Sequence, residues 1–200
     1  MTPIRTDRLI LRNWEERDRA LFHRINSDER VMEFFPFRRS RAEADAKLDE
    51  FRAGIERDGF GWTAAEIAAS GACIGFVGLH RTDHVPVLPA GGVEIGWRLA
   101  PEFWGKGYVS EAARAWLAFG FETLGLGEIV SFAVSDNARS TAVMERIGMR
   151  RDPARDFDHP GVPGTHPHLR RHVFYAAGRE DWQKSGLANG IYDRPFSRGG

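Results

Sequence analysis

The chain has 200 residues, enough for one domain with a full hydrophobic core. Hydrophobic residues make up 42% of it and include 6 Trp and 14 Phe, a composition typical of a globular protein and not of a disordered one. Lysine plus arginine and aspartate plus glutamate number 28 each, so no overall positive field suggests direct binding of nucleic acid.

Cys73 is the single cysteine, which excludes an intramolecular disulfide and a multi-cysteine metal site. Its apolar neighbours, residues 72–77, favour a buried structural thiol over a catalytic one. The first residues lack the apolar core of a secretory signal. No run approaches the roughly 18 apolar residues of a membrane span. We therefore expect a cytoplasmic protein that does not contact membranes.

The first half of the chain predicts two helices and a hairpin. A strand at 9–12 precedes a helical stretch at 17–26. Ser40 and Glu43 have the spacing of a capping box, which opens a polar helix that should stop near Gly59. The β-like runs 62–67 and 73–80 flank a short turn and predict a β-hairpin. The Phe-rich run 32–37 allows three interpretations: core, which is the default, a substrate wall, or the contact of a homodimer.

The second half alternates strands and helices. After a Pro/Gly-rich loop the predicted elements are strands at 93–99 and 128–135, a helix over 109–124 with an apolar face, a helix opened by Asp136 or Asn137 and ended by Gly148, a strand from Met149, and a strand at 172–176. A Pro/His-rich insertion lies at 152–171, and residues 184–200 predict a flexible tail. This order predicts a single α+β domain, residues 1–183, with a mixed sheet flanked by helices.

The stretch 101–112 combines glycines with the start of a helix. Gly105 and Gly107 allow an anion to approach the main chain, and the first-turn amides of the helix would point at it. Lys106 adds positive charge. A nucleotide P-loop is excluded because its first glycine and its metal-binding hydroxyl are missing, and a dinucleotide fingerprint is excluded because Ser110 replaces the third glycine. The pattern alone leaves two alternatives, a phosphate cradle and an ordinary strand-to-helix turn.

Residues 94–99 and 101–112 resemble the acetyl-CoA-binding motif of the GNAT superfamily of N-acetyltransferases, especially its RimJ/RimL-like branch, which acetylates protein N-termini. Residues 137–149 are similar to the family's helix on the other side of the cofactor. Glu102 departs from the Arg or Gln that usually opens the loop. The resemblance covers residues 5 to 178 and implies the GNAT fold, with a central, mostly antiparallel sheet flanked by helices.

The resemblance also implies acetyl-CoA as cosubstrate, no metal, and direct attack by an amine within a ternary complex. In the family, main-chain amides of the loop bind the CoA pyrophosphate and the helix asparagine binds the pantetheine arm. The cofactor-binding residues implied in this way are Trp97, Arg98, Leu99, Trp104, Gly105, Lys106, Gly107, Tyr108, Val109, Asn137 and Ser140.

Acyl transfer to an amine requires a base, because the pKa of an α-amine is near 8 and that of lysine is above 10. We favour Glu94, acting through water, with His80 as the rival base; a solvated strand-end residue is the alternative role for Glu94. Many GNAT proteins place a tyrosine acid at the position of Met144, which cannot donate a proton. Ser140 is then the better candidate for the acid, and Tyr175 is a weaker one.

The insertion is rich in Asp and His, but its spacings match no zinc signature. It is either a surface loop or a loop over the acceptor groove in which Asp156 or Asp158 holds the substrate ammonium. The expected partner is an amine acceptor, with a protein or peptide N-terminus favoured. The alternatives are a small-molecule amine, such as a polyamine, an aminoglycoside or an amino acid, and a non-catalytic acetyl-CoA-binding sensor.

Overall fold

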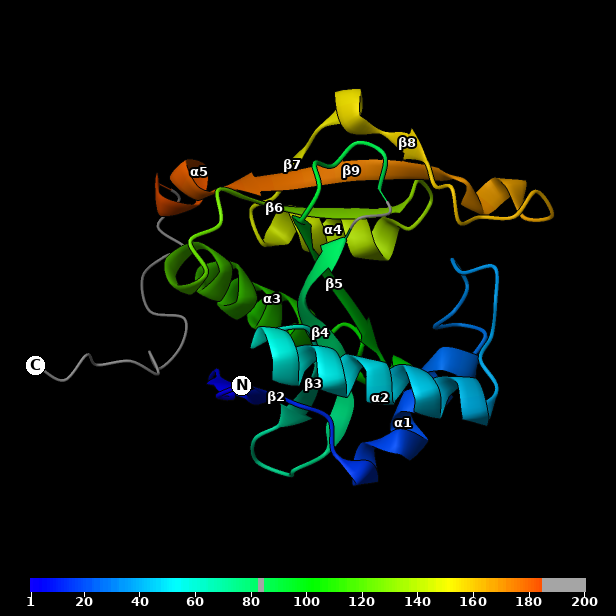
Figure 1. Ribbon diagram of the computed structural model, residues 1–200, viewed down its shortest axis with the longest axis vertical. Helices are drawn as coiled ribbons and strands as arrows, with labels where there is room; N and C mark the ends of the chain where they lie inside the picture. Colours follow the sequence, from blue (N-terminus) through cyan, green and yellow to red (C-terminus); the bar gives the residue numbers. More distant parts are fainter. Residues whose placement is uncertain (83–84, 185–200) are drawn as a thin grey trace, which may run out of the picture.

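A computed structural model describes residues 1–82 and 85–184, which form one mixed sheet flanked by helices (Figure 1). The strand order is β1-β2-β3-β4-β5-β6-β9-β7, with β8 paired to β9. The strands are β1 Ile4–Arg5, β2 Leu9–Arg12, β3 Trp62–Ile67, β4 Cys73–Thr82, β5 Gly92–Leu99, β6 Glu128–Val134, β7 Arg150–Arg151, β8 Phe157–Asp158 and β9 Arg171–Gly178. The predicted α+β class and mixed sheet are confirmed.

The helices cover both faces of this sheet. They are α1 Arg19–Ser27, α2 Arg41–Asp58, α3 Tyr108–Ala118, α4 Ala138–Arg146 and α5 Arg179–Lys184. Helices α1 and α2 pack on one face of β3 and β4, and α3 packs on the opposite face of β4 and β5. Helix α4 packs against β6 and β7 at the other end of the sheet (Figure 1).

The boundaries of α2 follow the cap signals in the sequence. Ser40 accepts a hydrogen bond from the Glu43 amide at 3.3 Å, and the Glu43 carboxylate accepts one from the Ser40 amide at 2.7 Å. The helix ends at Gly59, which adopts the left-handed conformation (φ 77°) that glycine favours. The predicted capping box and the predicted stop are therefore confirmed.

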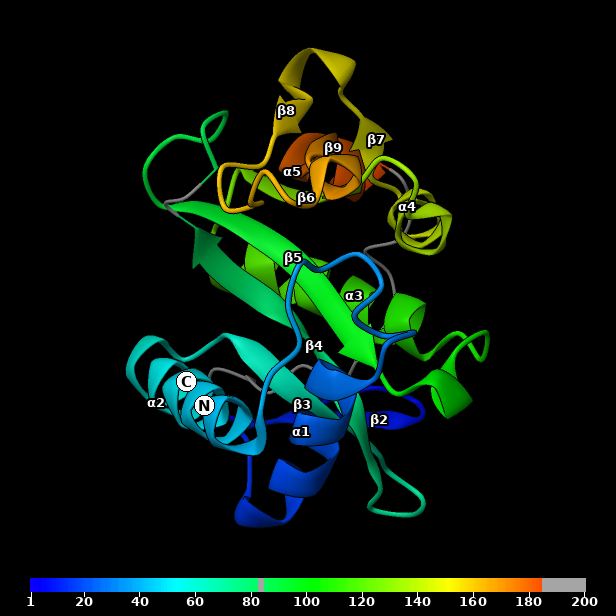
Figure 2. The ribbon, with the colours of Figure 1, turned by 90° about the vertical axis from the view of Figure 1, so that its right-hand side faces the viewer.

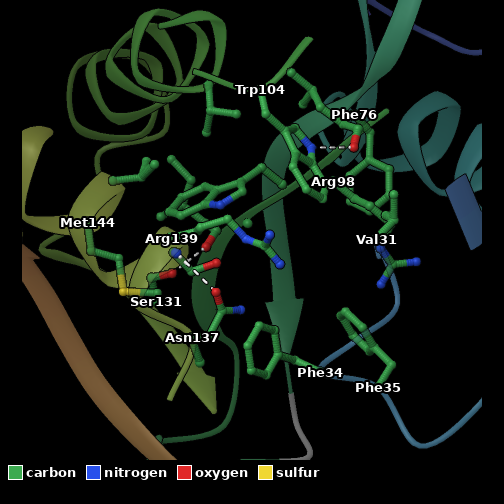
Figure 3. A pocket seen from close by; sticks show the side chains of 18 of the residues that line it. Val31, Phe34, Phe35, Phe76, Arg98, Trp104, Ser131, Asn137, Arg139 and Met144 are labelled. Atoms are coloured by element: carbon green, nitrogen blue, oxygen red, sulfur yellow. Dashed lines mark hydrogen bonds between the residues drawn. The ribbon is translucent and has the colours of Figure 1, made fainter. Parts of the chain in front are cut away.

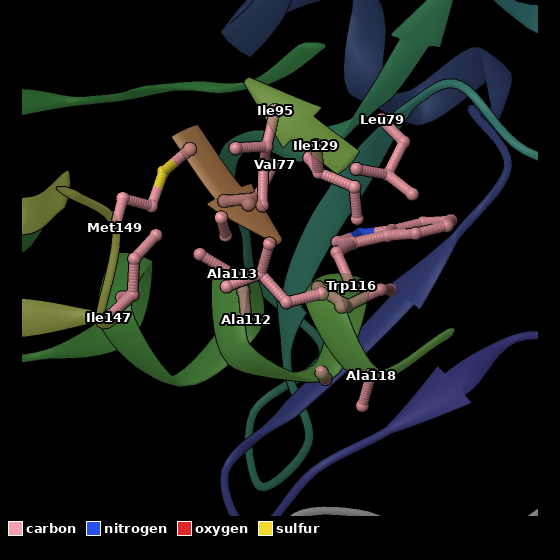
Figure 4. Close-up of a cluster of buried hydrophobic side chains, with 14 of the residues drawn as sticks. Val77, Leu79, Ile95, Ala112, Ala113, Trp116, Ala118, Ile129, Ile147 and Met149 are labelled. Atoms are coloured by element: carbon pink, nitrogen blue, oxygen red, sulfur yellow. The ribbon is translucent and has the colours of Figure 1, made fainter. Parts of the chain in front are cut away.

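The larger core lies between α3 and the sheet. Ala112, Ala113 and Trp116 of α3 face Val77 and Ile95 of the central strands (Figure 4). These side chains are buried, and full burial of a large apolar side chain stabilises a fold by about 1.5–3 kcal/mol. This core fixes the start of α3 relative to β5, the strand that borders the cavity described below.

The helix predicted over 109–124 is only partly right, because α3 ends at Ala118 and continues as a π-helical turn, Phe119–Thr123. Gly120 in this turn lies so close to β6 that a Cβ there would be 2.5 Å from Ile129 Cδ1. Close packing against β6 therefore favours glycine here, and apolar periodicity does not report such a contact.

Strands β5 and β6 are parallel neighbours that separate soon after they meet. Their register contains one pair, Glu94 opposite Val130. Residues 96–99 of β5 pair with β4 on one side and have no partner among the described strands on the other. The divergence is visible in Figure 2, where β5 runs away from β6 and β9. The second half of β5 therefore has one open edge.

Several elements differ from the predictions. The structure adds β1, β8 and α5, while β7 has only two residues and β9 extends beyond 172–176. Strand β8 lies inside the insertion, so the insertion is partly sheet and not wholly surface loop. The predicted tail, residues 184–200, lies outside the described residues except for Lys184, which ends α5. None of the helices in the described part of the chain is long and apolar enough to cross a membrane.

Candidate active site

A cavity of about 1580 Å³ lies where β5 and β6 diverge. Its walls come from β5, β6, the start of α3, the first turns of α4 and the segment 30–39 (Figure 3). Residues 107–109 and 137–140, which belong to the two motifs that resemble the same family, border this one cavity. The fold thus brings together segments that are nearly 30 residues apart in the chain.

The loop before α3 offers main-chain amides to this cavity. Gly105 and Gly107 both have positive φ angles, 72° and 79°, so the loop turns sharply into the helix. The first hydrogen bond of the helix runs from the Glu111 amide to the Gly107 carbonyl. Among the described residues, none accepts a hydrogen bond from the amides of residues 105–110. A helix start with unpaired amides and the positive end of its dipole suits a phosphate group.

The Lys106 side chain lies beside the described lining of the cavity and not in it. Gly105, Gly107, Tyr108 and Val109 line the cavity, whereas Lys106 does not belong to the described lining. Its ammonium lies over the Phe103 ring, 5.4 Å from the centroid.

The start of α4 forms the opposite side of the cavity. Asn137 caps this helix by accepting a hydrogen bond from the Ser140 amide at 3.1 Å, which confirms the predicted cap. The Asn137 carbonyl oxygen is thus committed to the cap, and its NH₂ group donates to no described residue. Ser140 lines the cavity as well. Each residue keeps a polar group that a bound ligand can use.

Two contacts that the sequence did not indicate shape the wall between the strands. Ser131 of β6 is buried, and its hydroxyl donates to the Ile95 carbonyl of β5 at 2.9 Å, which ties the two strands together at the point where they part. Arg139 lies over the Trp104 ring, 4.5 Å from the centroid, and pairs with Glu33 (Figure 3). No motif links these residues, because each contact joins distant parts of the chain.

Glu94, the favoured base, belongs to the wall of the cavity. It lines the cavity at the point where β5 leaves β6. Burial raises the pKa of its carboxyl to about 8, and none of the described residues donates a hydrogen bond to it. A carboxylate with a pKa near the operating pH can accept a proton from an ammonium group.

His80 lies directly across from Glu94 on β4, yet its surroundings differ. Its ring is exposed and stacks on Trp62, with 5.4 Å between ring centroids and an interplanar angle of 25°. His80 is not part of the described cavity lining, whereas Trp62 is. The geometry therefore favours Glu94 over His80 as the group that meets a substrate.

The acid candidates separate in a similar way. Met144 is buried in the cavity wall and carries no proton to donate. The Tyr175 hydroxyl donates to Glu145 at 3.0 Å and lies outside the described lining. Of the hydroxyl residues weighed from the sequence, Ser140 lies at the cavity.

The Phe-rich segment 32–37 is a cavity wall more than a core element. Met32 alone of its hydrophobic residues is fully buried, so the default interpretation as core is wrong for the phenylalanines. Phe34, Phe35 and Phe37 line the cavity, and Phe37 is 40% exposed. Together with Trp62 and Phe76 they form an aromatic wall on the α1/α2 side (Figure 3). A substrate wall and a dimer contact could not be ranked from the sequence, because residues 32–37 show no regular helix or strand pattern.

The insertion contributes one histidine to the cavity lining. His159 of the insertion and His172 of β9 both line the cavity, with ring centroids 5.0 Å apart. Burial lowers the pKa of His172. Asp156 instead pairs with Arg151 and accepts a hydrogen bond from the Phe174 amide, and neither Asp156 nor Asp158 is part of the described lining. The suggestion that one of them holds the substrate ammonium is therefore not supported.

Two other chemistries find no support in the described residues. No group of three or more His, Cys, Asp or Glu among them is arranged to hold a metal ion. Burial raises the pKa of the Cys73 thiol to about 12, so the reactive thiolate is disfavoured at neutral pH.

Comparison with known proteins agrees with this geometry. Residues 8–150 match the family model described as an acetyltransferase (GNAT) domain. The chain is 32% identical over 151 residues to the Bacillus subtilis protein described as "Uncharacterized N-acetyltransferase YnaD". The match covers 74% of this chain and 83% of that protein.

Solved structures of the same kind superpose well. An acetyltransferase of the GNAT family from Bacillus anthracis is 25% identical, with a TM-score of 0.73 over 90% of this chain and 99% of that one. The ribosomal-protein-S5-alanine acetyltransferase from Vibrio fischeri is 14% identical, with a TM-score of 0.69 over 91% of this chain and 99% of that one, a likeness of fold alone.

Proposed function

The chain belongs to the GNAT acetyltransferase family and is an acyltransferase, and from this premise we propose that it transfers the acetyl group of acetyl-CoA to a primary amine by direct attack within a ternary complex. The favoured acceptor is the N-terminal amine of a protein or peptide. The RimJ/RimL-like features of the sequence support this choice.

One observation carries the proposal. A single cavity joins the unpaired amides of residues 105–110 at one end to Glu94 at the divergence of β5 and β6. An anion cradle and a carboxylate with a raised pKa are the two groups that an acetyl-CoA-dependent N-acetyltransferase requires. The residues present therefore fit acetyl-CoA, which supplies the thioester when bound.

The amides of residues 105–110 would hold the pyrophosphate, and the NH₂ group of Asn137 would hold an amide oxygen of the pantetheine arm. The open edge of Trp97 to Leu99 would offer main-chain groups to the same arm and to the acetyl carbonyl. These contacts would orient the thioester carbonyl toward the aromatic wall.

Glu94 would accept the proton that the attacking ammonium must lose, directly or through one water molecule. The new N–C bond then forms as the C–S bond breaks, and the departing thiolate needs a proton or a hydrogen-bond donor. We assign this donor to the Ser140 hydroxyl, since Ser140 lines the cavity and Met144 carries no proton to donate.

The first test measures release of the CoA thiol from acetyl-CoA with a panel of amines and of peptides that begin with Ala, Ser or Met. We expect turnover on the peptides, and a loss of about 10²–10⁴-fold in kcat for Glu94→Gln at fixed pH, because general-base catalysis contributes on that order. His80→Gln is the matched control, since His80 lies outside the described lining and should retain most of the activity.

The outcomes separate the alternatives. Turnover on polyamines, aminoglycosides or amino acids in place of peptides would assign a small-molecule acceptor. Binding of acetyl-CoA without turnover of any amine would favour the sensor function. Full activity of Glu94→Gln would remove Glu94 from the mechanism.

A further inference from the structure

Arg98 presents a positive charge to the cavity from the side opposite α3. It follows Glu94 by four residues on β5 and lines the same cavity. Because side chains alternate along a strand, Glu94, Gly96 and Arg98 share one face. Phe76, directly across from Arg98 on β4, belongs to the cluster packed under α1 and α2. The Arg98 side chain therefore lies on the acceptor side and not on the α3 side, where the amides of residues 105–110 lie.

The position of the Arg98 side chain is fixed by neutral contacts. Its Nη1 donates to the Asn26 side-chain oxygen, and Asn26 is itself oriented by donating from Nδ2 to the Phe22 carbonyl at 2.7 Å. The guanidinium carbon lies 4.2 Å from the Phe35 ring centroid and 5.4 Å from that of Phe76 (Figure 3). These contacts hold the guanidinium in place without neutralising its charge.

Arg98 also has unused donor capacity. Its Nε atom is buried and has no hydrogen-bond partner among the described residues. No carboxylate of the described residues forms an ion pair with the Arg98 guanidinium. Burial, together with the nearby Arg39, lowers the pKa of Arg98 to about 9, so the group remains charged at neutral pH. A largely buried cation without a counter-charge costs free energy, and no carboxylate of the described residues supplies that counter-charge to Arg98.

The other cations on this side differ in their pairing. Arg30 is neutralised by Asp28 at 2.9 Å, and Lys47 by Glu50 at 2.6 Å. Arg39 lines the cavity with its guanidinium over the Phe37 ring at 4.7 Å, and no described carboxylate pairs with it. Arg98 and Arg39 are therefore two cations beside one aromatic wall that form no ion pair with the described residues.

We propose that Arg98, with Arg39 nearby, binds a carboxylate of the acceptor, so that the substrates are amines that carry a carboxylate at some distance from the amino group. This inference rests on the proposed acetyltransferase function. The planar guanidinium matches a carboxylate through two parallel hydrogen bonds. Polyamines and aminoglycosides bear several positive charges, so Arg98 and Arg39 would repel them.

The spacing along β5 indicates the size of the acceptor. Four residues of a strand span about 13 Å, with the base Glu94 at one end and Arg98 at the other. Since an extended peptide advances by about 3.3–3.6 Å per residue, a di- or tripeptide with a free C-terminus reaches further across this span than a single α-amino acid. Its apolar side chains would pack on Phe35, Trp62 and Phe76.

The test compares kcat/KM for the tripeptide Ala-Ala-Phe with that for its C-terminal amide, and uses spermidine as the polycationic probe. We expect the wild-type chain to prefer the free acid by about 10- to 100-fold, as one charge-assisted hydrogen-bonded pair allows, and to leave spermidine unacetylated. Arg98→Met should remove the preference by lowering the rate on the acid alone, with the Kd for acetyl-CoA unchanged. Arg30→Met removes an equal charge that Asp28 already neutralises, so it should keep the preference.

A second variant covers the case in which Arg98→Met fails to fold. Asn26→Asp places a carboxylate against Arg98 from within the chain, and it should abolish the preference for the free acid. Equal turnover of acid and amide by the wild-type chain, a preference that survives Asn26→Asp, or weakened acetyl-CoA binding in Arg98→Met would each overturn the inference. Failure of every amine to react would instead refute the proposed transferase function, and the two failures are thus distinguishable.

Discussion

Glu94 and His80 show that the chemical properties of a titratable side chain depend on its surroundings. They face each other across β4 and β5, but Glu94 points into the cavity while His80 is exposed and stacks on Trp62. Burial raises the pKa of the Glu94 carboxyl from an ordinary 4.5 to about 8. A raised pKa of this kind has a measurable consequence for folding stability, because the folded chain then binds a proton more tightly than the unfolded chain.

We predict that Glu94→Gln stabilises the protein at alkaline pH. The stabilising effect of the protonated carboxyl is fully present below pH 4.5 and is lost as the pH rises through about 8, because the folded state must then hold an uncompensated charge. The variant, which is neutral at every pH, should unfold at a higher urea concentration than the wild type at pH 9, by roughly 3–5 kcal/mol in unfolding free energy, because one pKa unit corresponds to about 1.4 kcal/mol. At pH 5, just above the pKa of the unfolded state, the difference should be below about 1 kcal/mol. A difference that stays constant from pH 5 to pH 9 would contradict the assignment.

At the scale of the element, the first turn of α4 combines a structural and a binding role in one residue. The side-chain oxygen of Asn137 caps the helix, while its NH₂ group is free of described partners and faces the proposed pantetheine site. The two roles use different atoms of the same side chain. Substitutions that keep one atom and remove the other can therefore separate them.

We expect Asn137→Ser to preserve stability and to weaken acetyl-CoA binding, because serine caps a helix as well as asparagine but offers no amide donor. Asn137→Ala should lose both the cap, at a cost of about 0.5–2 kcal/mol, and the binding contact. Thermal unfolding and calorimetric titration with acetyl-CoA measure the two effects. Wild-type affinity in Asn137→Ser would reduce Asn137 to a cap alone.

At the scale of the whole molecule, α5 closes the core behind α3. Trp182 is 4% exposed, and its ring centroid lies 5.3 Å from that of Phe121, in the turn that continues α3. Helix α5 is not predicted from the sequence, where only the Gly- and Pro-containing composition of the last residues indicates a domain end at residue 183. Its packing implies that the folded unit depends on residues 179–184.

A chain that ends after Lys184 should therefore keep the wild-type Tm and acetyl-CoA affinity. A chain that ends after Gly178 should unfold earlier by roughly 10 °C, because loss of a buried Trp costs about 3–5 kcal/mol and 1 kcal/mol corresponds to about 2–4 °C in a domain of this size. Differential scanning calorimetry on both chains checks this. Equal Tm values for the two would show that α5 does not support the core.

The sequence by itself determined the features that depend on near neighbours. These features are the capping box of α2, the asparagine cap of α4, the hairpin of β3 and β4, and the glycine turn before α3. Each depends on residues only a few positions apart, so it can be recognised in the sequence without the structure. The family followed from two such local motifs in order.

Only the tertiary structure decided the features that join distant segments. Four features arise where separate elements meet: the π-helical turn at Gly120, the Ser131 hydrogen bond to β5, the aromatic wall of residues 34–37, and the Arg98 charge, which no described carboxylate pairs. Burial and the field of neighbouring charges, which set the pKa values of Glu94 and Arg98, exist only after folding. The chain thus encodes its helix ends and turns locally, while packing determines which of its polar residues face the cavity.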